Sequence, residues 1–373
     1  MDIKTIAFYL PQFHPIPEND EAYGEGFTEW TNVKKAKPLF EGHNQPKVPL
    51  DNNYYSLLDV EVMINQAKMA RENGIYGFCY YHYWFKNGKK LLEKPLEMML
   101  GDKRVDIPFC LCWANENWTK RWDGGDNSII VSQDYDIYEI PEHVDYLCQF
   151  FRDKRYIKIQ GKPVMLIYRP ELIPKLRKYI NTIRTEIKKQ GFPGVVMICQ
   201  YPNFYMEGRK LDVFDYYIQF QPAFVCRDIG DRNMSGIQKI ARNVLITLNM
   251  RKLGRKILNL KNGKGNLDIR SYDSDWEEIL DYKVTDEKLI AGAFVDWDNT
   301  PRNTKGLVYQ GTTPEKFGKY FERLIDKVKK EYNHKWIFIN AWNEWAEGCY
   351  LEPDVKNGYE YLETLKKIMS YYK

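Results

Sequence analysis

The 373-residue sequence lacks the patterns that mark membrane and secreted proteins. It has no run of about 18 apolar residues, so no membrane-spanning helix is expected. The first residues, MDIKTIAFYLPQFH, contain neither a basic region followed by a long apolar segment nor a small-residue cleavage site, so we expect no signal peptide. The formal net charge of +4 is small and gives no reason to expect a nucleic-acid partner. These absences favour a cytoplasmic protein.

The seven cysteines and five histidines also lack the common catalytic and metal-binding spacings. There is no C-x-x-C pair, and Cys79, Cys110, Cys112 and Cys199 lie inside apolar runs, as is typical of buried thiols in a reducing compartment. The H-x-x-x-H spacing of a metal site and the G-x-S-x-G pattern of a nucleophilic serine are both missing. We therefore expect neither a metal nor a cofactor.

Short apolar runs rich in β-branched and aromatic residues alternate with helical patterns along the chain. The predicted strands are 5–10, 76–81, 108–113, 163–168, 195–200, 215–220, 290–295 and 336–341. Amphipathic helices are predicted over 57–74 and 313–332. Strands that are apolar throughout indicate a parallel sheet buried on both faces, and eight of them favour a (β/α)8 TIM barrel. A doubly wound sheet is the alternative, but the first strand is not followed by G-x-G-x-x-G.

A barrel of this kind carries its active site at the C-terminal ends of the strands. Polar and aromatic residues gather at the ends of the predicted strands, which makes them candidates for substrate binding. The candidates are Gln12, His14, His82, Trp84, Asn115, Glu116, Trp118, Arg121, Trp122, Tyr168, Asp296, Asp298, Asn299, Arg302, Asn343 and Trp345. Aromatic residues make up 15% of the chain, and because aromatic rings stack on sugar rings, this composition favours a carbohydrate ligand.

Glu344 and Glu347 in AWNEWAEGCYLEPD are the candidate catalytic residues. Glycosidic bond cleavage commonly uses two carboxyl groups. Two glutamates three residues apart on one loop approach the bond from the same side. This suits a scheme in which one carboxylate deprotonates a sugar hydroxyl that attacks the anomeric carbon, while the other protonates the leaving group. A solvated acidic turn is the alternative, although the neighbouring tryptophans argue against full solvation.

Two other segments have competing interpretations. In CWANENWTKRWDGG (112–125), Trp113, Trp118 and Trp122 can stack on sugars, but we expect at least one of them to belong to the core. In FVDWDNTPR (294–302), Asp296 and Asp298 match the short D-x-D pattern of metal-dependent glycosyltransferases. We favour hydroxyl recognition there, because a D-x-D metal site belongs to a nucleotide-binding sheet.

The segment between the sixth and seventh strands is about 70 residues long, far beyond a normal crossover. Nine basic and no acidic residues occur between Arg232 and Leu267. One interpretation is a basic amphipathic helix within 232–264 that contacts an anionic membrane or a lipid pyrophosphate. The other is a helical flap that packs on the barrel. We therefore describe the chain as a single catalytic domain, 1–373, with 225–285 as an inserted helical flap.

Several motifs together resemble one family. YLPQFHPIPEND, GEGFTEW, WANENWT, DWDNTPR and AWNEWAEG…LEPD are similar to the WbsX-type proteins of bacterial surface-polysaccharide gene clusters, which are glycosyltransferase-like and related to glycoside hydrolase family 99. The resemblance implies a (β/α)8 enzyme in which Glu344 deprotonates the sugar 2-hydroxyl, giving a 1,2-anhydro sugar, and Glu347 is the general acid and then base.

The expected activity is cleavage or transfer of a glycosyl unit, such as that of an α-mannoside, with retention, during assembly of O-antigen or capsule. The substrate is an oligosaccharide or a lipid-linked glycan, and the protein is cytoplasmic or peripheral at the inner membrane face. Two alternatives stay open. One is a nucleotide-sugar-dependent glycosyltransferase of lipopolysaccharide biosynthesis, and the other is a non-catalytic glycan-binding barrel.

Overall fold

The chain folds as a closed barrel of eight parallel strands. The computed structural model describes residues 2–120, 128–201, 211–226 and 267–372. The barrel strands, in chain order, are β1 (Lys4–Tyr9), β2 (Gly77–Trp84), β4 (Phe109–Trp113), β8 (Lys162–Ile167), β9 (Val196–Tyr201), β10 (Tyr216–Gln219), β12 (Leu289–Phe294) and β14 (Trp336–Asn340). Each pairs in parallel with the next, and β1 pairs with both β2 and β14, which closes the sheet. The predicted TIM barrel and its eight strands are confirmed.

The barrel interior is filled by large aromatic side chains. Phe8 of β1 lies 5.7 Å from Tyr81 of β2 and 5.6 Å from Phe338 of β14, measured between ring centroids. The strands are apolar on both faces because the helices cover their outer side. At Gly292 of β12, an added Cβ would lie 1.8 Å from the carbonyl oxygen of Gln219, so the close approach of β10 requires glycine there.

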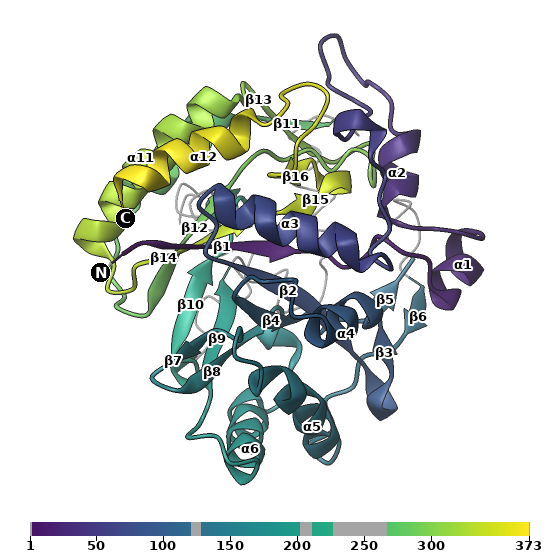
Figure 1. The fold of residues 1–373 in the computed structure, drawn as a ribbon, viewed down its shortest axis with the longest axis vertical. Coiled ribbons are helices and arrows are strands. Elements are labelled where there is room, and N and C mark those ends of the chain that lie inside the picture. The colour runs from purple at the N-terminus through teal and green to yellow at the C-terminus, as the bar shows by residue number, and fades with distance from the viewer. Residues whose placement is uncertain (1, 121–127, 202–210, 227–266, 373) are drawn as a thin grey trace, which may run out of the picture.

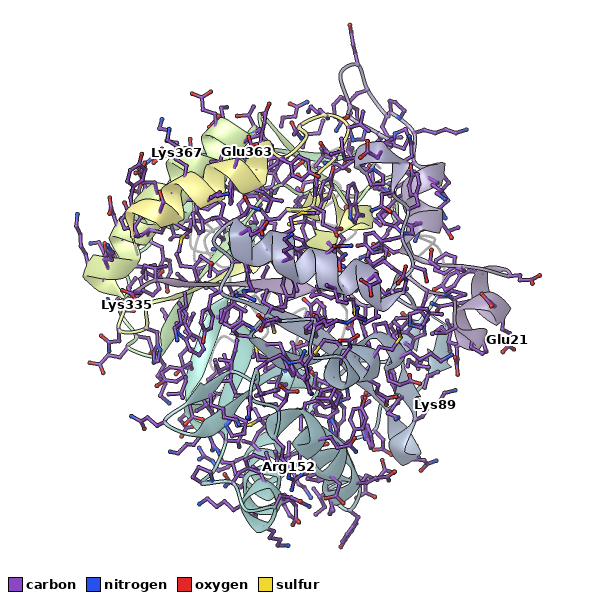
Figure 2. The ribbon with its side chains drawn as sticks, viewed as in Figure 1. Glu21, Lys89, Arg152, Lys335, Glu363 and Lys367 are labelled. Carbon is purple, nitrogen blue, oxygen red and sulfur yellow. The ribbon has the colours of Figure 1, made fainter. Side chains whose placement is uncertain are left out.

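Helices follow the strands and form the outer layer (Figure 1). They are α3 (Val60–Glu72), α4 (Lys94–Gly101), α5 (Ile140–Phe151), α6 (Leu176–Lys189), α10 (Tyr272–Asp281), α11 (Pro314–Glu331) and α12 (Glu360–Tyr371). The two helices predicted from sequence are α3 and α11, whose first turns are capped by the side chains of Asp59 and Thr313. Figure 2 shows Glu363 and Lys367 projecting from the outer face of α12, as expected for an amphipathic helix.

Short elements decorate the barrel. These are α1 (Pro17–Tyr23), α2 (Glu29–Lys35), β3 (Lys90–Leu91), β5 (Trp118–Thr119), β6 (Ile129–Val131), β7 (Lys158–Ile159), β11 (Asp268–Ser271), β13 (Leu307–Gln310), β15 (Asn343–Glu344), β16 (Cys349–Tyr350), and 3₁₀ turns at Leu50–Asn52, Lys86–Gly88, Pro170–Leu172, Leu211–Val213 and Trp345–Glu347. Helices α1 and α2 both belong to the long connection after β1.

The predicted insertion, 225–285, is described only in part. Its end forms α10, whose Trp276 stacks on Phe294 of β12 and on Tyr320 of α11. This end therefore belongs to the outer helical layer of the barrel. The basic segment 232–264 lies outside the described residues. Among the described residues, no helix joins the length and the apolar character that crossing a bilayer requires.

Candidate active site

A cavity of about 490 Å³ opens at the C-terminal mouth of the barrel. Its volume is typical of pockets for small ligands, which span roughly 300–1,000 Å³. The lining residues lie at the C-terminal ends of β2 and β14 or in the connections after β1, β4, β8, β10, β12 and β14, which is where a TIM barrel places its active site. The cavity brings together these predicted site residues: Glu116, Trp118, Tyr168, Asn299, Arg302, Glu344 and Glu347.

The loop after β14 presents Glu344 and Glu347 to this cavity. Strand β15 pairs antiparallel with β16, so Glu344 lies opposite Cys349, and the 3₁₀ turn between them carries Glu347. The turn ends at Gly348, whose φ of 62° lies in the left-handed region. A Cβ at Gly348 would also lie 2.9 Å from Cβ of Asp298. This tight turn holds both carboxyl groups on one side of the cavity.

Arg302, from the loop after β12, links the two glutamates. Its Nη1 donates to Oε1 of Glu347 at 2.5 Å, and its Nη2 donates to Oε2 of Glu344 at 3.3 Å. The same Nη2 donates to Oε1 of Glu29 at 2.6 Å. The side chains of Glu344 and Glu347 are 9% and 23% exposed, so Glu347 is the more open to a ligand.

The surroundings of the two glutamates favour proton uptake. Burial is the main reason that the pKa of Glu344 is raised well above its ordinary value, and the charge of Glu347 adds to this effect. Burial likewise raises the pKa of Glu347, against the opposing effect of Arg302. A pair of raised carboxyl pKa values near one arginine is the electrostatic setting in which one carboxyl can donate a proton while the other accepts one.

Aromatic rings form much of the remaining wall. The rings that line the cavity are those of Tyr81, Tyr83, Trp118, Tyr168, Phe220 and Trp297. Arg169 lines it as well and pairs with Glu116 at 3.1 Å. Apolar ring faces next to fixed hydrogen-bonding groups are suited to a sugar, whose C–H faces are apolar and whose hydroxyls are polar.

Three predicted binding residues instead hold the loops in place. Asn343 accepts from the backbone N–H of Leu10 at 2.7 Å and donates to its carbonyl at 3.0 Å. Asn115 makes the same reciprocal pair with the backbone of Arg169. Trp345 donates to Glu352 at 2.7 Å and is 1% exposed. These side chains support the cavity from behind.

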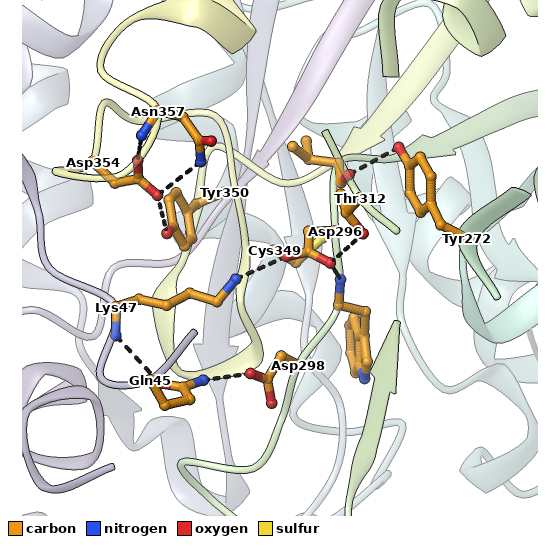
Figure 3. A network of polar contacts seen from close by, with 12 residues as sticks. Gln45, Lys47, Tyr272, Asp296, Asp298, Thr312, Cys349, Tyr350, Asp354 and Asn357 are labelled. Carbon is orange, nitrogen blue, oxygen red and sulfur yellow. Dashed lines mark hydrogen bonds and ion pairs between the residues drawn. The ribbon is translucent and has the colours of Figure 1, made fainter. Parts of the chain in front are cut away.

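Asp296 and Asp298 are also held by protein partners (Figure 3). Oδ2 of Asp296 accepts from Nζ of Lys47 at 2.8 Å, and Oδ2 of Asp298 accepts from Nε2 of Gln45 at 2.5 Å and lies 2.9 Å from Nε2 of His43. Asp298 is 3% exposed. Its backbone N–H donates to the carbonyl of Glu347 at 2.7 Å. The two carboxylates therefore tie the loop after β12 to the connection after β1, and the Asp298 backbone ties it to the loop that carries Glu347. Carboxylates held in this way do not support a D-x-D donor site.

His82 and Trp84 face the helical layer. Nε2 of His82 lies 2.8 Å from Nε2 of His143 on α5, and Trp84 stacks on the His143 ring. Side chains alternate along a strand, so Tyr81 and Tyr83 are the β2 residues that face the cavity. The prediction that His82 and Trp84 contact substrate is corrected by this alternation. Trp113 also packs outward, on His143, so the expected core tryptophan of its segment is found.

Gln12 and His14 follow β1 as predicted, but both are buried in the protein, at 0% and 1% exposure. Nδ1 of His14 lies 3.0 Å from the carbonyl of Pro15, and the carbonyl of Gln12 accepts from the backbone N–H of Glu29. Neither position supports a direct contact with substrate. The other two candidates, Arg121 and Trp122, lie outside the described residues.

Sequence reasoning missed Tyr81, Tyr83 and Glu29. Alternation along the strand puts Tyr81 and Tyr83 on one face and His82 and Trp84 on the other, but it does not show which face points inward. Glu29 lies in the GEGFTEW motif, but its distance from Glu347 along the chain hides their shared contact with Arg302.

The fold and the cavity define a (β/α)8 barrel with two glutamates at its mouth. The family model described as Glycosyltransferase WbsX matches residues 5–365, and the chain belongs to this family. Two strains of Xanthomonas campestris pv. campestris carry proteins named "Uncharacterized protein WxcX" that are each 34% identical to it. Those alignments cover 98% of this chain and 49% of the relatives, so the chain spans about half their length.

Solved structures share the barrel at low sequence identity. The GH99 endo-alpha-mannosidase from Bacteroides thetaiotaomicron in complex with bis-tris propane matches with a TM-score of 0.58 and 13% identity, over 100% of this chain and 98% of that one. A structure named "Glycoside hydrolase-like protein" matches with a TM-score of 0.58 and 13% identity, over 99% and 94% of the two chains. At this identity the similarity is evidence for the fold.

Proposed function

We propose that the protein is a retaining glycosidase or transglycosidase that acts on an oligosaccharide through Glu344 and Glu347. The observation that carries the proposal is the pair of carboxyl groups, one buried and one half-buried, that one arginine holds on one side of an aromatic-lined cavity. The family description and the barrel shared with an endo-alpha-mannosidase support a glycan substrate, and the latter favours an α-mannoside.

In the first step, the Glu344 carboxylate removes the proton of the sugar 2-hydroxyl. The 2-oxygen then bonds to the anomeric carbon while the glycosidic C–O bond breaks. The electron pair of that bond goes to the leaving oxygen, which takes its proton from Glu347. The product is a 1,2-anhydro sugar, and the anomeric configuration is inverted once. Two carboxyl groups on the same loop are suited to this one-sided attack.

In the second step, Glu347 accepts a proton from water or from the hydroxyl of an acceptor sugar. The oxygen of that molecule bonds to the anomeric carbon, the bond to the 2-oxygen breaks, and Glu344 returns the proton to the 2-oxygen. The second inversion gives overall retention. Water as the attacking group gives hydrolysis, and a sugar hydroxyl gives transfer.

The charges around the cavity favour this reaction over transfer from a nucleotide sugar. Arg302 is paired with Glu29, Glu344 and Glu347, and Arg169 is paired with Glu116 and Glu171. Within the described part of the chain, the arginines that line the cavity are thus outnumbered by their own carboxylate partners. An incoming diphosphate would meet an excess of negative charge, which disfavours its binding.

The biological setting belongs to the same proposal. The resemblance to WbsX-type proteins of surface-polysaccharide gene clusters favours a role in assembling O-antigen or capsule, with a lipid-linked glycan as substrate. Contact of residues 232–264 with an anionic membrane is proposed from their basic sequence alone. Sedimentation with vesicles at low salt tests this contact. The protein should sediment with vesicles of phosphatidylglycerol, which are anionic, and stay in solution with vesicles of phosphatidylcholine, which carry no net charge.

The test of activity is mass spectrometry of glycans after incubation with lipid-linked oligosaccharide from the host. Wild-type protein, Glu344→Gln and Glu347→Gln are compared, each with and without nucleotide sugars. Glu277→Gln, an exposed glutamate on α10, is the matched control. We expect shortened or rearranged glycans without any nucleotide sugar, from the wild-type and control proteins alone. Elongation that needs a nucleotide sugar, or full activity of Glu347→Gln, would overturn the proposal.

A further inference from the structure

Behind the catalytic loop lies a third carboxyl group, that of Glu29. It comes from the first turn of α2, and the residue is 0% exposed. Its Oε1 accepts two hydrogen bonds, one from Nη2 of Arg302 at 2.6 Å and one from the backbone N–H of Ala346 at 3.0 Å. One buried oxygen thus joins the arginine of the site to the residue that precedes Glu347.

The backbone around Glu29 is firmly placed. Its own N–H donates to the carbonyl of Gln12 at 3.0 Å, and the hydroxyl of Thr31 accepts from the N–H of Thr28 at 3.1 Å, which fixes the start of α2. The ring of Trp30 lies 5.3 Å from that of Trp345 in the catalytic loop. Helix α2 and the catalytic loop are therefore packed together, and Glu29 is the buried charge between them.

The charge of Glu29 acts on the same arginine as the two catalytic glutamates. The negative charge of Glu29 repels the carboxylate forms of Glu344 and Glu347, and this repulsion offsets part of the stabilisation that Arg302 gives them. The charge of Glu29 therefore contributes to the raised pKa values of both Glu344 and Glu347, after burial as the main cause. Other titratable groups that act on this pair or lie near it are Arg302, Glu116, Tyr81, Tyr83 and Cys349.

We propose that Glu29 is a positioning residue for the reaction at Glu344 and Glu347. By holding the Ala346 amide it fixes the turn that carries Glu347, and its negative charge beside Arg302 opposes the stabilisation that the arginine gives to the two carboxylate forms. The inference rests on the proposed function. It assigns no substrate contact to Glu29, which is buried away from the cavity.

Two variants separate the effect of the Glu29 charge from the effect of its side-chain length. Glu29→Gln removes the charge but keeps an oxygen that can accept from Arg302 and from Ala346. Glu29→Asp keeps the charge on a shorter side chain. Glu25→Gln, an exposed residue of the same GEGFTEW segment, is the matched control for the loss of one negative charge.

The pH dependence of kcat/KM is the first measurement. We expect Glu29→Gln to move both limbs of the profile to lower pH, and to lower kcat about tenfold or more at the wild-type optimum. Glu29→Asp should lower kcat while its limbs stay near those of wild type, and Glu25→Gln should match wild type. A Glu29→Gln profile whose limbs coincide with those of wild type would overturn the inference, even if the variant is less stable.

The second measurement does not depend on turnover. A water-soluble carbodiimide labels protonated carboxyl groups, and peptide mass spectrometry follows labelling at Glu344 and Glu347 as the pH is varied. The labelling midpoints should fall in Glu29→Gln and stay unchanged in Glu25→Gln. If wild-type protein turns over no glycan, the proposed function fails and the labelling still decides the role of Glu29. If Glu344→Gln and Glu347→Gln are inactive but the labelling midpoints of Glu344 and Glu347 are the same in Glu29→Gln as in wild type, the proposed function stands and this inference fails.

Discussion

Arg302 and Glu347 are joined by a 2.5 Å hydrogen bond from Nη1 to Oε1, whereas the contact of Arg302 with Glu344 measures 3.3 Å. The shorter bond stabilises the Glu347 carboxylate more strongly. A proton held by the pair in the free protein therefore rests on Glu344. For Glu347 to be the general acid, substrate must weaken its contact with Arg302 so that the proton is redistributed.

The roles of the two glutamates can be separated by leaving-group dependence. Aryl glycosides of the sugar that the enzyme releases should be compared, because a phenol of low pKa leaves without protonation. We expect Glu347→Gln to lose about 10²- to 10⁴-fold in kcat/KM on a poor leaving group and little on a good one. Glu344→Gln should lose activity on both. If Glu344→Gln instead loses activity only on the poor leaving group, and Glu347→Gln on both, Glu344 is the general acid and Glu347 the base.

Replacing Arg302 should shift the acidic limb of activity. The guanidinium opposes the raised pKa values of Glu344 and Glu347, so Arg302→Met should raise them further. The proposed base then stays protonated to higher pH, and the acidic limb of kcat/KM moves upward. Arg323→Met, at an exposed ion pair on α11, is the control and should leave the profile unchanged. An acidic limb that moves downward would contradict this reasoning.

The buried pair His82 and His143 should make stability depend on pH. Burial lowers the pKa of His82 to about 3 and that of His143 well below its ordinary value. The unfolded chain takes up protons below about pH 6.5, where the folded chain does not. The pair's contribution is therefore complete above about pH 6.5 and is lost as the pH falls toward 3. The maximal slope is about 1.4 kcal/mol per pH unit for each histidine.

Urea unfolding at several pH values between 7.5 and 4 measures this slope. The double variant His82→Phe/His143→Phe removes both titrating groups and should flatten the dependence on pH. A double variant with the same slope as wild type would assign the effect to other groups.

Lys47 should be essential for stability. Burial disfavours its charged form, but Asp296 and Asp298 outweigh that effect and raise its pKa. Lys47→Met would leave these carboxylates buried without their cation, which costs roughly 3–5 kcal/mol when one partner of a buried pair is removed. Thermal unfolding should show a clear fall in Tm, and Lys305→Met, an exposed lysine, should show none. An unchanged Tm in Lys47→Met would mean that the network of Figure 3 contributes little.

The barrel was predictable because each strand is a separate apolar run, and the position of Glu344 and Glu347 at the cavity because they follow the last strand among tryptophans. The orientation of side chains was not. Strand β2 is buried on both faces, so its sequence, GFCYYHYW, does not show whether histidine or tyrosine faces inward. Asp298 looks like a ligand in sequence because its partners, His43 and Gln45, lie more than 250 residues away. Glu29 is hidden for the same reason.

The barrel keeps its carboxyl pair apart from much of the aromatic wall of the cavity. Glu344 and Glu347 lie on a single loop, and Arg302 and Glu29 brace it, whereas much of the aromatic wall comes from β2 and the connections after β4, β8 and β10. Those connections can diverge without disturbing the carboxyl pair. Under the proposed function, changes in those connections would alter which glycan the cavity accepts and leave the chemistry of the carboxyl pair in place. Exchange of these connections is then the way to change the glycan that such a barrel accepts.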